Sequence, residues 1–149
     1  MSSASFPANC DIFISYCWKK NKEKVHEMHK KLSQKFPKIW IDINEMDYGD
    51  LNEMMSEGIS QSKVFICCLT EEYCKSKNCM KEFNFADKLR KPIVYVIFEE
   101  IGGLTEPEIT KKFSPVSFTM GSQMFYKHQK FDEILAVIGK LLVILFFYC

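Results

Sequence analysis

A single glutamate, Glu82, stands where a carboxylate can do chemistry. It lies in the stretch Ser76–Ala86, which follows the apolar run Val64–Leu69 and predicts the start of a helix. Helix N-termini carry partial positive charge and unpaired N–H groups, so a carboxylate in the first turn stays ionised. Ser76 and Asn78 are the candidate N-caps, which places Glu82 in that turn. The stretch therefore offers either a fixed anion for a ligand or a glutamate that only complements the helix dipole.

Metal chemistry is not indicated. The seven cysteines have irregular spacings and include no Cys-x-x-Cys pair, and His26, His29 and His128 do not complete a ligand pattern. We expect no metal site. An odd number of scattered thiols is typical of a reduced, cytoplasmic protein.

The elements that must position Glu82 follow from the hydrophobic pattern. Five β-rich runs predict strands at residues 11–16, 39–42, 63–69, 93–98 and 116–118. Apolar stripes at helical spacing predict helices over about 25–36, 50–59, 79–90 and 131–147. This alternation predicts an α/β, flavodoxin-like three-layer domain with a parallel sheet of about five strands, order 2-1-3-4-5, and helices on both faces. Residues 1–10 are expected to be a disordered segment before a single domain over 11–149.

Composition and missing motifs exclude several classes. The net charge is +1 and nearly all basic residues are lysine, so nucleic acid is not an expected partner. No Gly-x-Gly-x-x-Gly or P-loop is present, and Ser15 and Tyr16 give the first strand no acidic end for Mg²⁺. The apolar run Leu141–Cys149 is too short to span a bilayer, so a membrane is expected only if the chain continues past Cys149.

The expected winding creates a crevice. In sheets of this order, ligands bind beyond the carboxyl ends of the strands, where the winding reverses between strands one and three. That crevice would be lined by Tyr16, Cys17 and Trp18 after the first strand and by Thr70–Cys79 after the third. Glu82 would lie at its mouth.

The same residues resemble a known family. Four motifs occur in order at the family's spacing: Asp11–Tyr16, Trp40–Asp42 with Met46 and Gly49, Ile59–Val64, and Tyr73-x-x-Ser76-x-x-Cys79-x-x-Glu82. Together they resemble Toll/interleukin-1 receptor (TIR) domains, over roughly residues 11–100.

The resemblance to NAD⁺-cleaving TIR domains implies a catalytic role for Glu82 in innate-immune or cell-death signalling. NAD⁺ would be the substrate, with no cofactor, and nicotinamide would be released with hydrolysis or cyclisation of the remainder. Tyr16 and Trp18 would stack on a ring of the substrate. The other expected substrate-binding residues are Cys17, Asp42, Ser76, Asn78 and Cys79.

A non-catalytic reading stays open beside this one. TIR domains also act as scaffolds that bind other TIR domains through the BB loop, here represented by Asn44, Met46, Tyr48, Gly49 and Asp50. Enzymatic TIR sites are often completed by a second protomer, so both readings imply a homo-oligomer. The chain departs from many enzymatic members at Asn78, where they have an aromatic residue, and from receptor BB loops at Tyr48-Gly49, where they have Pro-Gly.

Overall fold

A parallel β-sheet forms the centre of the molecule. The computed structural model describes residues 11–41, 53–98, 102, 108, 123–126 and 131–148. Its strands, in the spatial order β2-β1-β3-β4-β5, all pair in parallel. They are β1 (Ile12–Tyr16), β2 (Ile39–Ile41), β3 (Val64–Cys68), β4 (Ile93–Ile97) and β5 (Gln123–Tyr126). The predicted fold class and the order 2-1-3-4 are confirmed. The predicted fifth strand, at 116–118, lies outside the described residues, and the strand that pairs with β4 is β5.

The three central strands are buried along their whole length. Every residue of β1, β3 and β4 is buried, because helices cover both faces of the sheet. Side chains alternate between the faces, so neighbours along β1 belong to different cores. Ile12, Ile14 and Tyr16 pack in one core, and Phe13 and Cys17 in the other.

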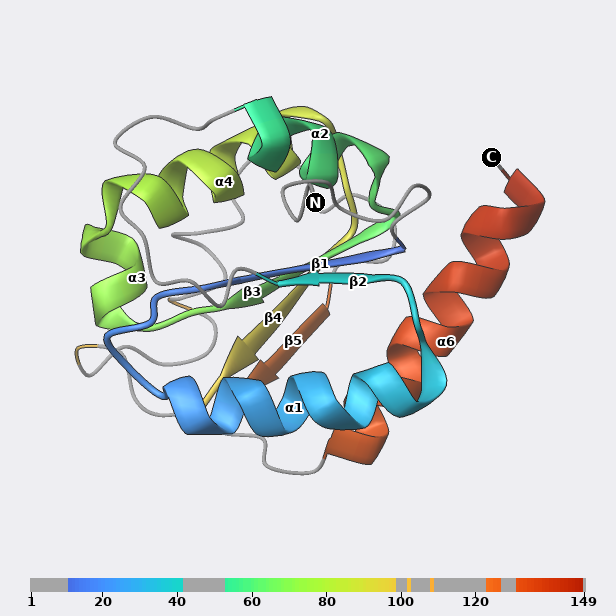
Figure 1. Cartoon of the computed structure of the whole chain (residues 1–149), viewed down its shortest axis with the longest axis horizontal. Helices are drawn as coiled ribbons and strands as arrows, with labels where there is room; N and C mark the ends of the chain where they lie inside the picture. The colour runs from blue at the N-terminus through green and yellow to red at the C-terminus, as the bar shows by residue number, and fades with distance from the viewer. Residues whose placement is uncertain are drawn as a thin grey trace, which may run out of the picture.

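The helices divide between these two faces. In Figure 1, α1 (Lys22–Lys35) and α6 (Phe131–Tyr148) lie on one side of the sheet, and α2 (Glu53–Gln61), α3 (Glu71–Lys75) and α4 (Lys77–Lys88) lie on the other. We call the cluster under α1 and α6 the α1/α6 core and the cluster under α2, α3 and α4 the α4 core. These are the three layers that the sequence predicts.

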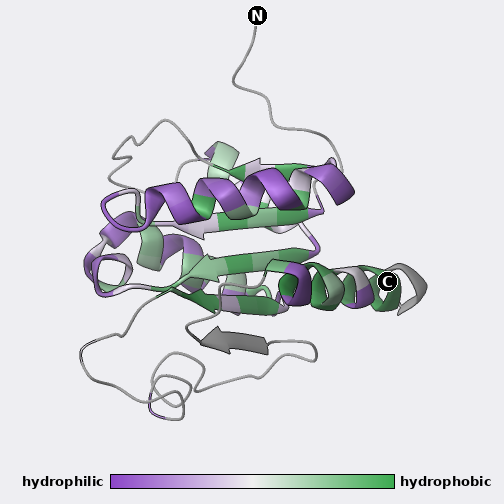
Figure 2. Cartoon of the chain, turned by 90° about the horizontal axis from the view of Figure 1, so that it is seen from below, coloured by the Kyte–Doolittle hydropathy of each residue, from purple (hydrophilic) through white to green (hydrophobic). Residues whose placement is uncertain are grey.

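The two helices of the α1/α6 core differ in character. Figure 2 shows that α1 is mostly polar and that α6 is mostly apolar. The buried residues of α1 are Val25, Met28 and Leu32, which form a narrow apolar stripe. Val143 and Ile144 of α6 are largely exposed. Among the described residues, no helix combines the length and apolar character needed to cross a bilayer.

The segment after β3 corrects two predictions. Residues 70–78 are not a simple loop, because α3 begins behind Thr70, whose hydroxyl oxygen accepts a 2.9 Å hydrogen bond from the backbone N–H of Tyr73. A second cap, Ser76, then starts α4 at Lys77, two residues before the predicted start at Cys79. Glu82 therefore lies in the second turn, and the predicted first-turn position is wrong.

Candidate active site

Glu82 turns inward from α4 toward the end of β1. Its side chain is buried, with 9% of the residue exposed. The hydroxyl of Ser15 donates a 2.7 Å hydrogen bond to Oε1 of Glu82. The helix dipole acts mainly on the first turn, and this charge-assisted contact connects the carboxylate to the strand.

A third polar group extends this contact into the α4 core. The hydroxyl oxygen of Ser15 lies 2.7 Å from the hydroxyl of Tyr73 in α3. Because the only hydroxyl hydrogen of Ser15 points to Glu82, Tyr73 is the donor in this second bond. Burial raises the pKa of Tyr73, and the nearby Cys67, Cys79 and Glu82 add to the shift, so the phenol stays protonated and able to donate. The result is a directed chain from Tyr73 through Ser15 to Glu82.

Two thiols lie beside this chain. Cys17 follows β1 and Cys79 is in the first turn of α4; both are buried and neither is in a disulfide. The neighbouring Cys79 side chain lowers the pKa of Cys17 to about 6, against the effect of burial. The neighbouring Cys17 side chain, together with burial and the charge of Glu82, raises the pKa of Cys79. Cys79 therefore stays protonated, and its thiol donates a hydrogen bond to the carbonyl oxygen of Tyr16, with 3.6 Å between sulfur and oxygen.

Ser76 and Asn78 have different local roles. The hydroxyl oxygen of Ser76 accepts a 3.2 Å hydrogen bond from the backbone N–H of Cys79, so Ser76 is the N-cap of α4 and Asn78 is not. Both residues are half-buried. Ser76 precedes the helix that carries Glu82, and Asn78 lies in its first turn. Their predicted substrate-binding roles stay predictions.

Tyr16 and Trp18, the two aromatic residues of the predicted site, lie in different surroundings: Tyr16 is buried and Trp18 is exposed. The side chain of Tyr16 packs in the α1/α6 core, and its hydroxyl lies 3.2 Å from Nε2 of His26. Strand alternation explains this, because Ser15 and Cys17 face the α4 core and Tyr16 between them faces the other way. The structure thus does not bring the Tyr16 ring to Glu82. Trp18, beyond the strand, is 41% exposed, and Nζ of Lys19 lies 5.9 Å from the centre of its ring.

The remaining predicted residues lie outside the described part of the chain. They are Asp42 and the BB-loop residues Asn44, Met46, Tyr48, Gly49 and Asp50. Their predicted roles stay predictions.

Two residues of the site were missed in the sequence. Ser15 and Tyr73 occur in the motifs but were not assigned to the site. A signal for Ser15 was present, since a polar residue in a strand that is buried on both faces needs a hydrogen-bond partner. Nothing in the sequence named Glu82 and Tyr73 as the partners.

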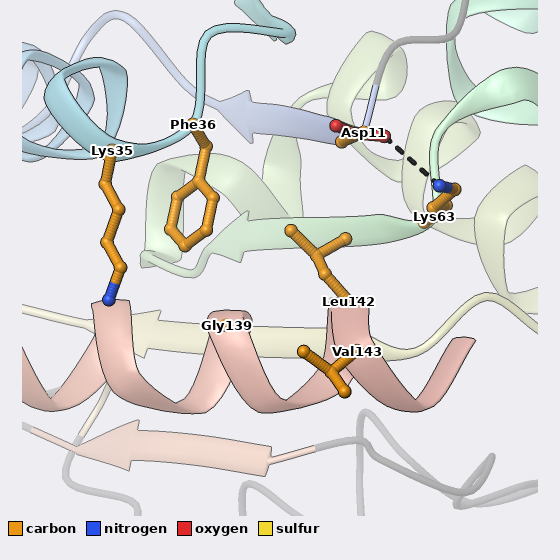
Figure 3. Close-up of a pocket in the computed structure, with 7 residues that line it drawn as sticks. All are labelled: Asp11, Lys35, Phe36, Lys63, Gly139, Leu142 and Val143. Atoms are coloured by element: carbon orange, nitrogen blue, oxygen red, sulfur yellow. Dashed lines mark ion pairs between the residues drawn. The ribbon is translucent and has the colours of Figure 1, made fainter. Parts of the chain in front are cut away.

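A hollow elsewhere in the molecule is distinct from this site. It encloses about 530 Å³ between the end of α1 and α6. In Figure 3, Phe36 points from the end of α1 toward Gly139, and Asp11 pairs with Lys63 at the far side, with 3.5 Å between Oδ1 and Nζ. Asp11 and Lys63 precede β1 and β3, so the hollow lies at the amino ends of the strands, away from Ser15 and Glu82.

Metal-binding side chains do not cluster in the described regions. Within 11–41, 53–98, 123–126 and 131–148, no group of three or more His, Cys, Asp or Glu residues is arranged to hold a metal ion. The groups that the structure describes around the Glu82 carboxylate include the hydroxyls of Ser15 and Tyr73 and the thiols of Cys17 and Cys79.

Comparisons with known proteins identify the family. A family model described as "TIR domain" matches residues 12–135. No curated protein shows significant sequence similarity to the chain. Among solved structures, the TIR domains of the activated Roq1 resistosome, which directly recognises the pathogen effector XopQ, align with a TM-score of 0.56 and 15% identity, over 88% of this chain and 82% of that one. The Clostridium botulinum CMP N-glycosidase BcmB aligns with the same TM-score and identity, over 87% of this chain and 97% of that one. The two structural alignments show that these proteins have a similar fold. The family match shows that the chain belongs to the TIR domain family.

Proposed function

We propose that this TIR domain cleaves the bond between nicotinamide and ribose in NAD⁺, with Glu82 as the catalytic residue. The observation that carries the proposal is the oriented carboxylate: Glu82 is 9% exposed and hydrogen-bonded to Ser15 near the carboxyl end of β1. That is the edge of a doubly wound sheet at which ligands bind.

The reaction suits a single carboxylate. The leaving nicotinamide of NAD⁺ is already a cationic pyridinium, so it departs without a general acid, unlike the sugars cleaved by paired carboxyl groups. The ribose left behind is electron-poor and oxocarbenium-like. A fixed anion in a site with little water stabilises such a cation strongly, because it needs no reorganisation.

We propose roles in substrate binding for four further residues. Trp18, which is exposed beyond β1, supplies an aromatic face for stacking on a ring of the dinucleotide. Ser76, Asn78 and Cys79 would line the ribose side at the start of α4. BcmB, which has the same fold, is named for cleavage of an N-glycosidic bond in a nucleotide, and this is the same class of bond.

The test follows nicotinamide release from NAD⁺ by the concentrated, purified chain. We expect Glu82→Gln to abolish release, because the amide keeps the shape and can still accept from Ser15 but carries no charge. Glu57→Gln, on the exposed face of α2, is the matched control and should leave release unchanged. An inactive wild type under clustering conditions, or an active Glu82→Gln, would contradict the proposal.

A second candidate is a non-catalytic TIR–TIR interaction module that uses the BB loop. The deep burial of Glu82 favours it, because a carboxylate held by Ser15 at 9% exposure also serves a purely structural role. On this reading the chain self-associates without turnover. Gly49→Pro should then abolish association in analytical ultracentrifugation while the circular dichroism spectrum is retained. Unchanged association would exclude the BB loop as the interface.

A further inference from the structure

The hollow between the end of α1 and α6 has a mostly apolar wall. We call it the α1–α6 hollow. Phe36 and Leu142 pack at the partly buried edge of the α1/α6 core, and Val143 next to Leu142 is 58% exposed. Small-molecule sites typically enclose about 300–1,000 Å³ and are lined by apolar side chains with a few polar groups. At about 530 Å³, the α1–α6 hollow has the size and the lining of such a site.

Gly139 in α6 keeps the hollow open. A Cβ at this position would lie 3.9 Å from Cζ of Phe36 and 4.0 Å from Nζ of Lys35, and both are ordinary contacts. Packing therefore does not require a glycine here, although glycine lowers the stability of a helix relative to alanine. Binding sites commonly give up stability in this way. The missing side chain leaves room for a ligand between α1 and α6.

Lys35 supplies a positive charge at one end of the hollow. It is the basic residue in the last turn of α1, where its charge complements the helix dipole. Its side chain nevertheless extends from α1 toward α6 (Figure 3). The distance of 4.0 Å from Nζ to a Cβ at Gly139 agrees with this direction. The ammonium is therefore placed to meet a group that binds between the two helices.

The charges around the hollow are not balanced. Lys63 and Asp11, at the other end in Figure 3, form an ion pair with 3.5 Å between Nζ and Oδ1. Within the part of the chain that the structure describes, no carboxylate forms an ion pair with Lys35. Two lysines and one aspartate line the hollow, so its net charge is +1 and lies at Lys35. A ligand with one negative charge complements this arrangement.

The apolar side chains lie between the two charged ends. In Figure 3, Phe36 and Leu142 stand between Lys35 on one side and the ion pair on the other. A linear apolar chain with an anionic group at Lys35 would therefore run along Phe36 and Leu142. This order of groups favours an acyl chain with a terminal carboxylate.

We infer that the α1–α6 hollow binds a free medium-chain fatty acid, with its carboxylate at Lys35 and its alkyl chain against Phe36 and Leu142. Each methylene that leaves water favours binding, because apolar surface is buried. An ion pair with an exposed ammonium contributes less, so Lys35 selects the sign of the head group and the chain supplies most of the affinity. The hollow lies at the amino ends of the strands, so this ligand does not share the site around Glu82.

The test locates binding on the full-length chain and does not depend on any activity. The chain, labelled with ¹⁵N-glycine, is titrated with sodium decanoate below the concentration at which decanoate forms micelles. The protein has six glycines, and loss of one signal in Gly139→Ala assigns Gly139. We expect a saturable shift of the Gly139 amide signal. Gly58 in α2, on the opposite face of the sheet, is the internal control and should not shift.

The role of the charge is tested by calorimetric titration. Lys35→Glu should weaken decanoate binding about tenfold, because one attraction is lost and one repulsion of similar size is gained. Lys30→Glu is the matched control, since Lys30 is exposed on the same helix and does not line the hollow. It should leave the affinity almost unchanged. Decyltrimethylammonium, which has the same chain and the opposite charge, should bind at least tenfold more weakly than decanoate.

A blocking variant tests the space itself. Gly139→Leu places a side chain in the hollow and raises helix propensity, so it should fold and lose the heat of decanoate binding. The absence of a Gly139 shift in the wild-type chain, or an equal shift at Gly58, would overturn the inference. A Gly139 signal that moves with protein concentration and not with decanoate would also overturn it, since a second copy of the chain would then occupy this face. Where Gly139→Leu fails to fold, the glycine signals and Lys35→Glu decide the matter.

Discussion

Ser15 and Glu82 are separated by 67 positions in the sequence and joined by a 2.7 Å hydrogen bond in the fold. The bond connects the central strand to α4, and the Tyr73 hydroxyl supports it from α3. Three elements thus fix the direction of one carboxylate. A group held in this way is pre-organised, which is what electrostatic stabilisation of a developing cation requires.

Removing the Ser15 hydroxyl should slow the chemical step and leave substrate binding almost unchanged. We expect Ser15→Ala to lower kcat for nicotinamide release about tenfold to a hundredfold, because hydrogen bonds to charged groups contribute about 1.5–3 kcal/mol. KM should change little, since Ser15 is a positioning residue that acts through Glu82. Steady-state kinetics over a range of NAD⁺ concentrations measures both constants.

Ser62 offers a matched control for that substitution. It is as buried as Ser15, with 1% exposed, and its hydroxyl donates a 2.8 Å hydrogen bond to the carbonyl oxygen of Ile59, away from the site. Ser62→Ala should cost about 1 kcal/mol of stability without altering kcat. Equal losses of kcat in the two variants would show that Ser15 acts only on stability.

The N-cap of α4 should contribute measurably to the free energy of unfolding. We expect Ser76→Ala to lower the free energy of unfolding by about 1 kcal/mol, because the backbone N–H of Cys79 loses its acceptor. Ser76→Asp keeps an acceptor and adds a favourable charge at the helix N-terminus, so it should retain stability. Urea denaturation checks both. Ser60→Ala, on the exposed face of α2, is the control and should stay within about 0.5 kcal/mol; an equal loss there would contradict the capping role.

Two helical glycines should respond to alanine in opposite directions. At Gly58 in α2, a Cβ would lie 3.3 Å from Cε2 of the Phe13 ring, which is 1% exposed and stacks on Phe65. Overpacking costs about 1–3 kcal/mol, which outweighs a gain in helix propensity of about 1 kcal/mol, so Gly58→Ala should destabilise. At Gly139 in α6 the nearest atom would be Cζ of Phe36 at 3.9 Å, an ordinary contact. Gly139→Ala should therefore raise the unfolding midpoint, and thermal unfolding of the two variants side by side tests the difference in sign.

The sequence predicts the frame of this fold well because buried parallel strands leave a direct signal. The runs at Val64–Cys68 and Ile93–Ile97 are apolar without interruption, and Ser15 is the one small polar residue within Ile12–Tyr16. The helices between these strands carry apolar stripes at helical spacing. The short α3 was missed, since five residues are too few to form a stripe, although Thr70 followed by two glutamates was a usable capping signal. That omission also shifted the expected start of α4 and with it the turn assigned to Glu82.

The contacts within the site were harder to predict than the frame. Alternation along β1 separates Tyr16 from Ser15 and Cys17, and applying it would have removed the Tyr16 ring from the predicted crevice. The partners of Ser15 depend on how α3 and α4 rotate and slide over the sheet. Packing against the whole α4 core fixes that placement, and no local pattern encodes it.

The acidity of Cys17 gives a pH-dependent prediction with a definite sign. A thiol reacts with iodoacetamide as its thiolate, and the neighbouring Cys79 side chain lowers the pKa of Cys17 from 9.0 to about 6. The alkylation rate of Cys17 should therefore rise from pH 5, reach half its maximum near pH 6, and be flat by pH 8. The alkylation rate of an ordinary small thiol, by contrast, keeps rising up to about pH 9. Rates come from the labelling of peptide 1–19 in Cys10→Ser, where Cys17 is its only cysteine. Cys79→Ala removes the neighbouring thiol and should move the midpoint upward, and a midpoint that is the same with and without Cys79 would contradict the effect of Cys79 on the pKa of Cys17.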